Sequence, residues 1–546
     1  MDNPESNRAR IFPATRRVLG APVWTCLEKV MARQGLDYEN LPELISEIAP
    51  AAPAWAQELA MVELARELVR LAAQEGAADV EAMAVNPALQ LLPVCWRGLP
   101  GVVRGANEAP RRENAHILVW SPPGVHDCEG GAAVRVAEAS GEDLLALKIV
   151  AEDMPLEAVA REAQVTTAVL RQVLRRTADR GLLLAPPSLL VRDASSHPRP
   201  QPVSPDSRSS RVPADVFASE YFTLQWHITQ RCDLHCKHCY DRSEREDVDL
   251  GRGLGLLDEL ARFCEERRVQ GQATFTGGNP ILHPHFLELY AAAAERGLSV
   301  ALLANPCGEN MLDAMLDIAA PSYFQVSLEG LEEHNDAIRG PGHFRRTMAF
   351  LDLLAERGVP SQVMLTLTRG NQGQVIPLAR ALEGRVGTFT FNRLAPVGEG
   401  AALACANTAG FSDFLREYLA AAEGMDHIGL KDNLFNALPD MGQVLHGGCT
   451  GHGCGAAFNF FAVLSDGAAH ACRKMASPIG NVYEQGLAGV YDGDPAAAYR
   501  RGSTACAGCD IRAVCGGCMA VVKGLGQDPF TERDPYCFYG AAPSMK

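Results

Sequence analysis

The sequence of 546 residues lacks three features that would point to a membrane or to the outside of a cell. No run approaches the ~18 consecutive apolar residues that a membrane-spanning helix needs. The first residues, MDNPESNRARIF, contain no apolar core of the kind that a signal peptide has. Positive charge is in deficit, because 50 Lys and Arg stand against 66 Asp and Glu, for a net charge of −16. We therefore predict a cytoplasmic protein with no membrane partner. The negative charge also argues against general binding to nucleic acid, although a local basic patch is compatible with this net charge.

Cysteine, by contrast, is abundant, with 17 residues. In a large chain without a signal peptide, so many cysteines indicate metal or redox chemistry rather than disulfides. Eleven of them fall into three tight groups: Cys232, Cys236 and Cys239; Cys449, Cys454 and Cys472; and Cys506, Cys509, Cys515, Cys518 and Cys537. The other six are predicted to be buried, inert thiols: Cys26, Cys95, Cys128, Cys264, Cys307 and Cys405.

The N-terminal part of the chain reads as two small domains and a linker. Residues 1–112 are rich in Ala and Leu with helical periodicity, which predicts a helical domain without an assigned role. Residues 113–195 contain two strand-like runs, three helical stretches and a further strand-like run at 188–193, the pattern of a winged helix-turn-helix. Residues 196–217 are predicted to be a linker because this stretch is rich in Pro and Ser. Everything before the linker is expected to be removable as a unit.

Strand-like and helix-like segments then alternate over residues 218–405. The strand-like segments are residues 221–228, 272–278, 299–305, 323–330, 361–368 and 388–394. Such βα repeats predict an α/β fold with a parallel sheet, open or partly closed into a barrel, with ligands at the C-terminal ends of its strands. Residues 406–546 are cysteine-rich and glycine-rich, and we predict a small domain there that is held together by metal.

The first cysteine group stands in the segment RCDLHCKHCY, just beyond the end of the first of these strands. Four thiolates would complete a zinc site or an ordinary iron–sulfur cubane, whereas three leave one metal corner open. His235 and His238 lie inside the loop and are predicted to be structural or exposed. The open iron of a [4Fe–4S] cluster could bind a substrate or a cofactor directly.

Cys232-x3-Cys236-x2-Cys239 followed by Tyr240, at the end of the first strand of a (βα)6 pattern, resembles the radical SAM superfamily. The resemblance covers about residues 218–546. It implies a partial (βα)6 TIM-type barrel, with S-adenosylmethionine bound to the open iron of the cluster. It further implies cleavage of that cofactor to a 5′-deoxyadenosyl radical, with an electron from a reductase of flavodoxin or ferredoxin type. In such an enzyme the cofactor carries the difficult chemistry, and the protein positions and shields it.

The resemblance also implies a set of cofactor-binding residues: Tyr240, Gly277, Gly278, Asn279, Pro280, Asn305, Ser327, Glu329 and Arg339. The family's Gly-Gly-Glu-Pro motif has Asn279 in place of its Glu. An amide oxygen can still accept from the ammonium group of S-adenosylmethionine, but without the charge-assisted part of the bond. The alternative for each polar residue is solvation or capping of a strand end, and for the glycine pair a tight turn without a ligand.

The C-terminal cysteines resemble the SPASM pattern of auxiliary clusters, which makes three [4Fe–4S] clusters in all. By that resemblance Cys449, Cys454, Cys472 and Cys518 hold one auxiliary cluster. The other is held by Cys506, Cys509, Cys515 and Cys537. The gap before Cys518 is two residues where the family has three, which puts its assignment in question. Two zinc sites are the alternative, since C-x2-C also suits zinc.

SPASM enzymes include peptide maturases, sulfatase maturases and enzymes of small molecules. Residues 113–195 resemble a PqqD-like element, which recognises the leader of a precursor peptide by adding it as a strand. We therefore predict a peptide maturase that introduces a crosslink or another oxidative modification, with no catalytic residue assigned beyond the cluster. The alternatives are an enzyme of a small metabolite or of a protein side chain, and a DNA-binding regulator. The regulator would use the basic residues Arg171, Arg175, Arg176 and Arg180, which can equally be a solvated helix face.

Overall fold

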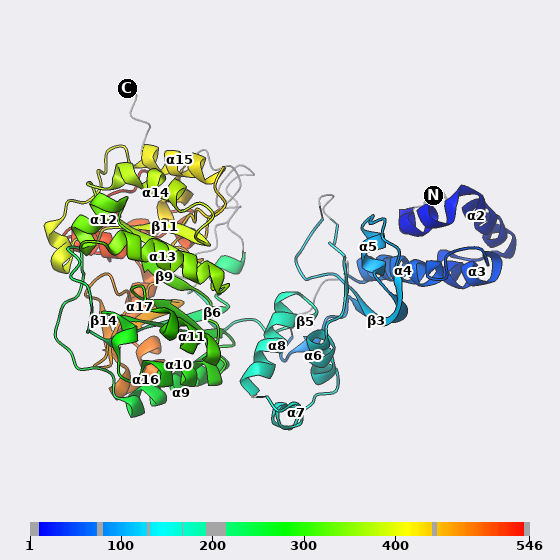
Figure 1. Ribbon diagram of the computed structural model, residues 1–546, viewed down its shortest axis with the longest axis horizontal. Coiled ribbons are helices and arrows are strands. Elements are labelled where there is room, and N and C mark those ends of the chain that lie inside the picture. Colours follow the sequence, from blue (N-terminus) through cyan, green and yellow to red (C-terminus); the bar gives the residue numbers. More distant parts are fainter. Residues whose placement is uncertain are drawn as a thin grey trace. The chain divides into compact units, whose positions relative to one another are not determined.

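The computed structural model describes residues 10–73, 80–127, 131–165, 167–192, 214–438 and 445–539. The chain divides into two compact units, Met1–Pro187 and Ser188–Lys546, which are drawn in Figure 1 and are described separately. Most of the predicted linker, like Cys128, lies outside the described residues. None of the helices in the described ranges has both the length and the apolar character needed to cross a bilayer.

The first unit begins with helices α2 (Pro13–Gln34), α3 (Leu41–Ile48) and α4 (Ala56–Ala72). The carboxylate of Glu63 on α4 is buried and accepts from the backbone N–H groups of Ala14 and Thr15, at 2.8 Å each. These N–H groups belong to the first turn of α2 and have no partner within that helix. The helical prediction is therefore confirmed for this part of the chain.

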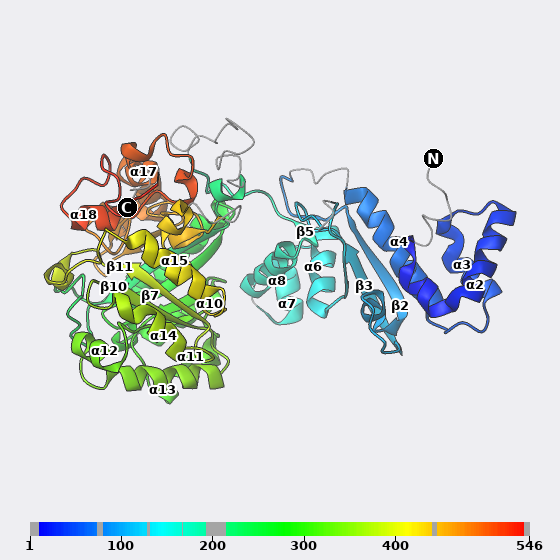
Figure 2. The same cartoon turned by 90° about the horizontal axis from the view of Figure 1, so that it is seen from above.

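A sheet follows, with strands β2 (Leu89–Arg97), β3 (Arg111–Trp120) and β4 (Arg135–Glu138) in antiparallel order β2-β3-β4. Helix α5 (Leu99–Val103) connects the first two strands, and α4 packs on the sheet (Figure 2). The predicted domain boundary at residue 112 is wrong, because it falls inside β3 and separates it from β2. Strand β2 escaped prediction because Pro93 interrupts its run, and a bulge between Val94 and Trp96 shifts its register.

The sheet is followed by helices α6 (Gly141–Ala151), α7 (Leu156–Ala163) and α8 (Thr167–Asp179), as the sequence predicts. Strand β5 (Leu183–Leu184) pairs with β1 (Ala84–Val85) in a separate antiparallel pair. The strand predicted at 188–193 is not part of this element. Its residues belong to the second unit, where Val191 forms a single bridge with Ala218.

The second unit contains one mixed sheet of order β11-β10-β9-β8-β7-β6-β12-β13-β14. Its first six members are parallel and confirm the predicted strands: β6 (Tyr221–Thr229), β7 (Gln270–Gly277), β8 (Ser299–Leu303), β9 (Phe324–Ser327), β10 (Ser361–Leu367) and β11 (Thr388–Arg393). The connecting helices are α9 (Leu250–Glu266), α10 (Phe286–Glu295), α11 (Glu309–Ile318), α12 (Glu332–Arg339), α13 (His343–Glu356), α14 (Val375–Ala381) and α15 (Phe411–Ala422). This is the predicted α/β fold with a partial barrel.

Strand β6 shows how the sheet separates its apolar face from its site-forming face. Side chains alternate along a strand, so every second residue points the same way. Phe222, Leu224 and Trp226 are buried in the main core, where the ring of Phe222 lies 4.8 Å from that of Phe263 on α9. The intervening positions carry polar side chains, and His227 among them lines the pocket described below.

The C-terminal region continues the same sheet, which the sequence did not predict. Strand β12 (Phe460–Val463) pairs in parallel with β6, and β13 (Ala468–His470) and β14 (Pro478–Asn481) extend it in antiparallel pairs. Helices α16 (Val482–Asp492), α17 (Asp494–Arg501) and α18 (Met519–Gly524) complete the region. The predicted small domain held together by metal is thus also held by apolar packing, since this part shares the main apolar core.

The segment that begins at Ser188 is also built into the second unit. Leu190 is buried in the main core, and Arg192 donates to the backbone oxygen of Cys454 at 3.2 Å. Burial lowers the pKa of Arg192 to about 10. The expectation that everything before the linker is removable is therefore corrected, because a truncation has to stop before Ser188.

Candidate active site

The triad of Cys232, Cys236 and Cys239 follows β6 at the C-terminal ends of the parallel strands, where such sheets bind ligands. Its residues line a cavity of about 350 Å³, within the range of small-molecule sites. Of the residues predicted to bind the cofactor, those that line this cavity are Tyr240, Gly277, Gly278, Asn305, Ser327 and Arg339. Asn279, Pro280 and Glu329 directly follow or adjoin these residues in the sequence and are buried.

The glycine pair clamps the triad loop from one side. Gly277 has a φ of +136°, and a Cβ on it would lie 2.2 Å from the backbone oxygen of Thr229. A Cβ on Gly278 would lie 2.2 Å from the backbone oxygen of Arg231. The N–H groups of Gly278 and Asn279 donate to these same two oxygens, at 2.9 and 2.7 Å. Both positions therefore need glycine for backbone approach, whether or not a ligand also touches them.

Two further backbone contacts hold the rest of the loop. The N–H of Lys237 donates to the oxygen of Ile338 at 3.0 Å, and the N–H of Glu399 donates to the oxygen of Cys239 at 2.9 Å. The side chain of Arg242 adds a bond to the oxygen of Cys236 at 2.8 Å. The loop is thus fixed by segments that follow β7, β9 and β11.

Asp233 lies between two of the predicted cofactor-binding amides. Its Oδ1 accepts from Nδ2 of Asn279 at 2.9 Å and from Nδ2 of Asn305 at 2.6 Å. The Asn305 amide also lies 3.7 Å from the sulfur of Cys232. Asn279 is 4% exposed, and its Oδ1 has no hydrogen-bond partner among the described residues. This buried acceptor is what the ammonium group of S-adenosylmethionine would satisfy.

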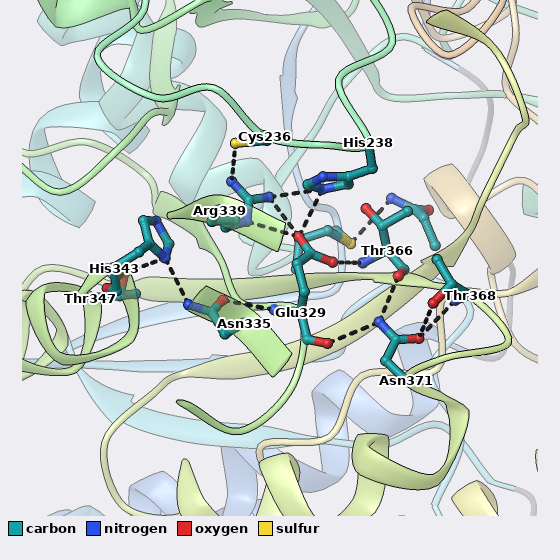
Figure 3. Close-up of polar contacts among 12 residues, drawn as sticks. Cys236, His238, Glu329, Asn335, Arg339, His343, Thr347, Thr366, Thr368 and Asn371 are labelled. Atoms are coloured by element: carbon teal, nitrogen blue, oxygen red, sulfur yellow. Dashed lines mark hydrogen bonds and ion pairs between the residues drawn. The ribbon is translucent and has the colours of Figure 1, made fainter. Parts of the chain in front are cut away.

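Glu329 occupies the centre of a buried polar network shown in Figure 3. Its Oε1 accepts from Nε and Nη2 of Arg339, at 2.9 and 2.6 Å, and lies 2.9 Å from Nε2 of His238. Its Oε2 accepts from the N–H of Thr366 at 2.8 Å. Burial opposes ionisation, but His238 and Arg339 prevail and lower the pKa of Glu329 to about 2. The carboxylate is fully engaged, so it acts on the site through Arg339 and His238.

Arg339 connects this network to the triad, because its Nη1 lies 3.7 Å from the sulfur of Cys236 (Figure 3). Two amides secure the backbone of Glu329 from behind. Oδ1 of Asn335 accepts from its N–H at 3.1 Å, and Nδ2 of Asn371 donates to its oxygen at 2.9 Å. The partners come from α12, β10 and the loop after β10, segments that are far apart in the sequence.

Tyr240 forms an aromatic wall of the cavity with His227. The Tyr240 hydroxyl lies 3.4 Å from Nε2 of His227, and their rings meet edge to face. Burial raises the pKa of Tyr240 to about 12 and lowers that of His227 to about 3. Both side chains are therefore neutral at neutral pH.

The C-terminal cysteines gather into the two sets that the resemblance implies. Cys506, Cys509, Cys515 and Cys537 line one small cavity. Cys454 and Cys472 each lie close enough to Cys449 and Cys518 for their charges to interact. Burial raises the pKa of Cys454 to about 12 and that of Cys515 well above its ordinary value. Thiols in such positions ionise when a metal binds them.

The scattered cysteines only partly match the prediction. Cys264 is buried, but Cys26 and Cys95 are exposed, so these two are not the inert core thiols that we predicted. Cys307 and Cys405 are half-buried. Within the described ranges, no three His, Cys, Asp or Glu side chains converge closely enough to hold a single metal ion. A four-iron cluster does not require this, because each thiolate binds a different iron.

Several residues that line the triad cavity were not predicted from the sequence: Gln325, Met364, Thr366, Asn392, Arg393, Arg473 and Lys474. Asn392 carried a usable signal, since it stands at the end of the last parallel strand. Arg473 and Lys474 also carried one, because they follow Cys472 directly. Their approach to the triad depends on the pairing of β12 with β6, which no local pattern reveals.

Two family models match this chain. Residues 226–380 match the Radical SAM superfamily, and residues 454–510 match an iron–sulfur cluster-binding domain, SPASM. The chain carries a radical SAM domain and a SPASM domain. The predicted radical SAM and SPASM domains are thereby confirmed. Domains of these two kinds support S-adenosylmethionine and iron–sulfur clusters as cofactors. The second match favours clusters over the zinc alternative.

Among relatives, the mycofactocin maturase MftC of Mycobacterium ulcerans is 33% identical over 185 residues, which are 33% of this chain and 48% of that one. The AdoMet-dependent heme synthase of Methanosarcina barkeri is 25% identical over 359 residues, 58% of this chain and 96% of that one. This chain thus spans about half the length of the maturase and nearly all of the heme synthase. The structure of SuiB from Streptococcus suis has a TM-score of 0.48 at 15% identity, over 77% of this chain and 96% of that one.

Proposed function

We propose that the protein is a radical SAM/SPASM peptide maturase that acts on a ribosomally made precursor peptide and leaves a crosslink or another oxidative modification. When bound, S-adenosylmethionine supplies a 5′-deoxyadenosyl radical, after reductive cleavage, that takes a hydrogen atom from the substrate. The proposal is carried by one observation: an active-site cavity with three thiols stands in a chain that also has a separate sheet-and-helix unit. A heme synthase matched over 96% of its length leaves part of this chain without a counterpart.

The residues of this chain have distinct roles in the proposal. The triad thiolates hold the cluster that binds the cofactor. Oδ1 of Asn279 accepts from the cofactor's ammonium group, and Ser327 and Asn305 are the polar groups on the cavity wall that meet the rest of it. Glu329 orients Arg339 beside Cys236. Tyr240 and His227, both neutral, shield the cavity without adding charge.

The proposal assigns three [4Fe–4S] clusters. One is held by the triad and two by the C-terminal sets, in which Cys518 joins Cys449, Cys454 and Cys472 despite its shortened spacing. The auxiliary clusters would accept the electron that leaves the substrate radical, and a reductase of flavodoxin or ferredoxin type would supply the first electron.

The sheet β2-β3-β4 with helices α6–α8 is the proposed recognition element for the leader of the precursor. An extended peptide can add to the open edge of a sheet, where backbone hydrogen bonds supply affinity and pockets supply specificity. The proposed recognition element covers about residues 84–184 instead of the predicted 113–195. The bounds change because β1 and β2 belong to the same unit.

The test is anaerobic capture with the full, cluster-loaded chain as bait for the peptide fraction of its host, read by mass spectrometry. We expect one short, ribosomally encoded peptide, which then loses hydrogen when it is incubated with the protein, S-adenosylmethionine and a reductant. The matched control is residues 188–546, which keep the Arg192 segment in place. This control should still form 5′-deoxyadenosine slowly but should capture no peptide. Equal capture by both chains, or none by either, would contradict the proposal.

A small-molecule enzyme is the second candidate, and the heme synthase match favours it. It would be supported if small metabolites, and no peptide, stimulated formation of 5′-deoxyadenosine by both chains alike. A DNA-binding regulator fits the structure less well. Arg176 on α8 pairs with Glu142 of α6 at 3.0 Å, and Arg180, just after α8, pairs with Asp143 of α6 at 2.5 Å. Part of the basic face is therefore already neutralised.

A further inference from the structure

Two cations of the SPASM region, Arg473 and Lys474, line the cavity that holds the triad. They follow Cys472 directly, at the turn between β13 and β14. This position places them between the triad and the set formed by Cys449, Cys454, Cys472 and Cys518.

Arg473 faces the barrel strands. Its Nη1 donates to Oγ1 of Thr276 at 3.4 Å, and its guanidinium carbon lies 5.9 Å from the centre of the Tyr240 ring. Among the described residues, the bonds to Thr276 and Tyr240 use fewer than half of the five N–H donors of the guanidinium, so the others can reach a ligand. Lys474 lies close enough to Cys449, Cys472 and Cys518 for their charges to interact.

The remaining charged side chains of the cavity wall have partners of opposite sign. Arg339 pairs with Glu329, and Asp241 pairs with Arg245. Arg393 pairs with Asp432 at 2.6 Å and Asp534 at 2.8 Å. In the described part of the chain, no carboxylate lies within 4.0 Å of the cationic groups of Arg473 or Lys474. The auxiliary thiolates compensate Lys474 in part, so the surplus positive charge is greatest at Arg473.

The rest of the cavity surface suits a polar ligand. The barrel strands contribute Gln325, Ser327, Thr366 and Asn392 to it. His227 is 2% exposed, and its Nδ1 has no hydrogen-bond partner among the described residues. An unpaired buried polar group costs free energy, so a polar substrate atom in this cavity would relieve that cost.

We propose that Arg473 and Lys474 bind a carboxylate of the substrate. The inference rests on the proposed function and names its substrate class: a molecule with a carboxylate close to the carbon that loses hydrogen. The planar fork of Arg473 matches the two oxygens of a carboxylate, and Lys474 adds a point charge from the auxiliary side. Held in this way, the substrate lies between the radical source and the thiolates of the auxiliary site.

The first test needs no knowledge of the natural substrate. Succinate is titrated into the full, reduced, cluster-loaded protein with S-adenosylmethionine present, and the electron paramagnetic resonance spectra of the clusters are followed. We expect a saturable change with succinate and none with succinamide, its neutral isostere. Arg473→Gln and Lys474→Gln should each weaken the response about tenfold, the effect of losing a charge-assisted hydrogen bond of about 1.5 kcal/mol.

Two control variants separate the loss of a specific contact from a general effect of charge in this region. Arg473→Lys keeps the charge and should retain part of the response. Lys523→Gln removes a charge from the same region, at a side chain outside the cavity lining that bonds to the backbone of Ala476, and it should leave the response unchanged. Iron content reports folding of every variant. No response to succinate, an equal response to succinamide, or an unaltered response in the Arg473→Gln, Lys474→Gln double variant would overturn the inference.

The second test uses the peptide that the full chain captures, synthesised with each carboxylate in turn replaced by a carboxamide. One replacement should weaken binding about tenfold, and the loss should not add to that of Arg473→Gln. Equal binding of every carboxamide peptide would overturn the inference and leave the maturase intact. A succinate response without any captured peptide would support the carboxylate site and contradict the proposed maturase.

Discussion

The loops around the two groups of cysteine sites are held by different means. The triad loop is fixed by backbone bonds from neighbouring strand ends and by the buried network around Glu329 (Figure 3). Its thiols face a cavity, and Cys232 is exposed. The C-terminal thiols are part of the packing themselves, since Cys515 is buried in the main core and Cys454, Cys472 and Cys509 pack against it. We therefore expect the scaffold of the first site to form without its metal, and metal binding at the second site to contribute to folding.

The largest expected effect follows from replacing Cys232, Cys236 and Cys239 together by Ala. Reductive cleavage of S-adenosylmethionine should fall below detection, because no iron remains to bind the cofactor. About eight iron atoms should stay, four for each auxiliary cluster. Thermal unfolding should change little, because the loop is held by other contacts. Residual formation of 5′-deoxyadenosine, measured by liquid chromatography, would contradict the assignment of this site.

At the auxiliary sites, replacing a cysteine should affect the stability of the protein as well as its iron content. Cys515→Ala should remove up to about four iron atoms and lower the unfolding temperature markedly, because a thiolate that binds metal also organises the loops around it. Cys264→Ala is the matched control, since Cys264 is equally buried but lies on α9, away from these sets. It should cost only the lost packing, about 1–3 kcal/mol, and no iron. Equal iron loss in both variants, or in neither, would show that Cys515 is not a ligand.

The sequence predicts the first of these regions better than the second. The parallel strands have clear apolar runs that end in polar residues, and the cysteine spacing marks their functional edge. The second region was predicted as a small metal-held domain without assigned strands, because β12 is short and its partner β6 lies far earlier in the chain. The same reason hides Arg473 and Lys474, whose place in the cavity depends on that pairing.

Long-range partners within the site were equally invisible. Glu329 stood out as a polar residue at a strand end, but its engagement by Thr366 and His238 joins segments that no periodicity connects. Asp233 gave no signal of its own, although it binds both Asn279 and Asn305. In the first unit, β2 was not predicted because Pro93 interrupts it. As a result, the predicted domain boundary fell inside β3.

The Glu329 network should respond as a buried ion pair does. Glu329→Gln leaves Arg339 without its carboxylate in a buried site, which should lower the free energy of unfolding by about 3–5 kcal/mol. Asp352→Asn removes a carboxylate from an exposed pair with Arg385 at 3.2 Å and should cost at most about 1 kcal/mol. Chemical denaturation of both variants gives the comparison. Similar costs would mean that the buried network contributes no more to stability than an exposed ion pair does.

The smallest effect is expected at Asn279, where this chain departs from the family motif. Asn279→Glu places a carboxylate beside Asp233, whose Oδ1 now accepts from the Asn279 amide at 2.9 Å. Repulsion and the lost bond should lower stability by about 1–3 kcal/mol and weaken retention of S-adenosylmethionine. Adding Asp233→Asn should recover both, because the amide introduced at position 233 can donate to the carboxylate introduced at position 279. That carboxylate is then held in place to accept from the cofactor's ammonium group with charge assistance.

The two single variants and the double variant form a double-mutant cycle. Equilibrium dialysis measures their binding of S-adenosylmethionine, and thermal unfolding measures their stability. The loss caused by Asn279→Glu should depend on the residue at position 233, because the two side chains are in direct contact. If Asn279→Glu alone binds the cofactor as well as the parent chain, Asp233 does not control this side chain, and the amide is exchangeable with the family's carboxylate.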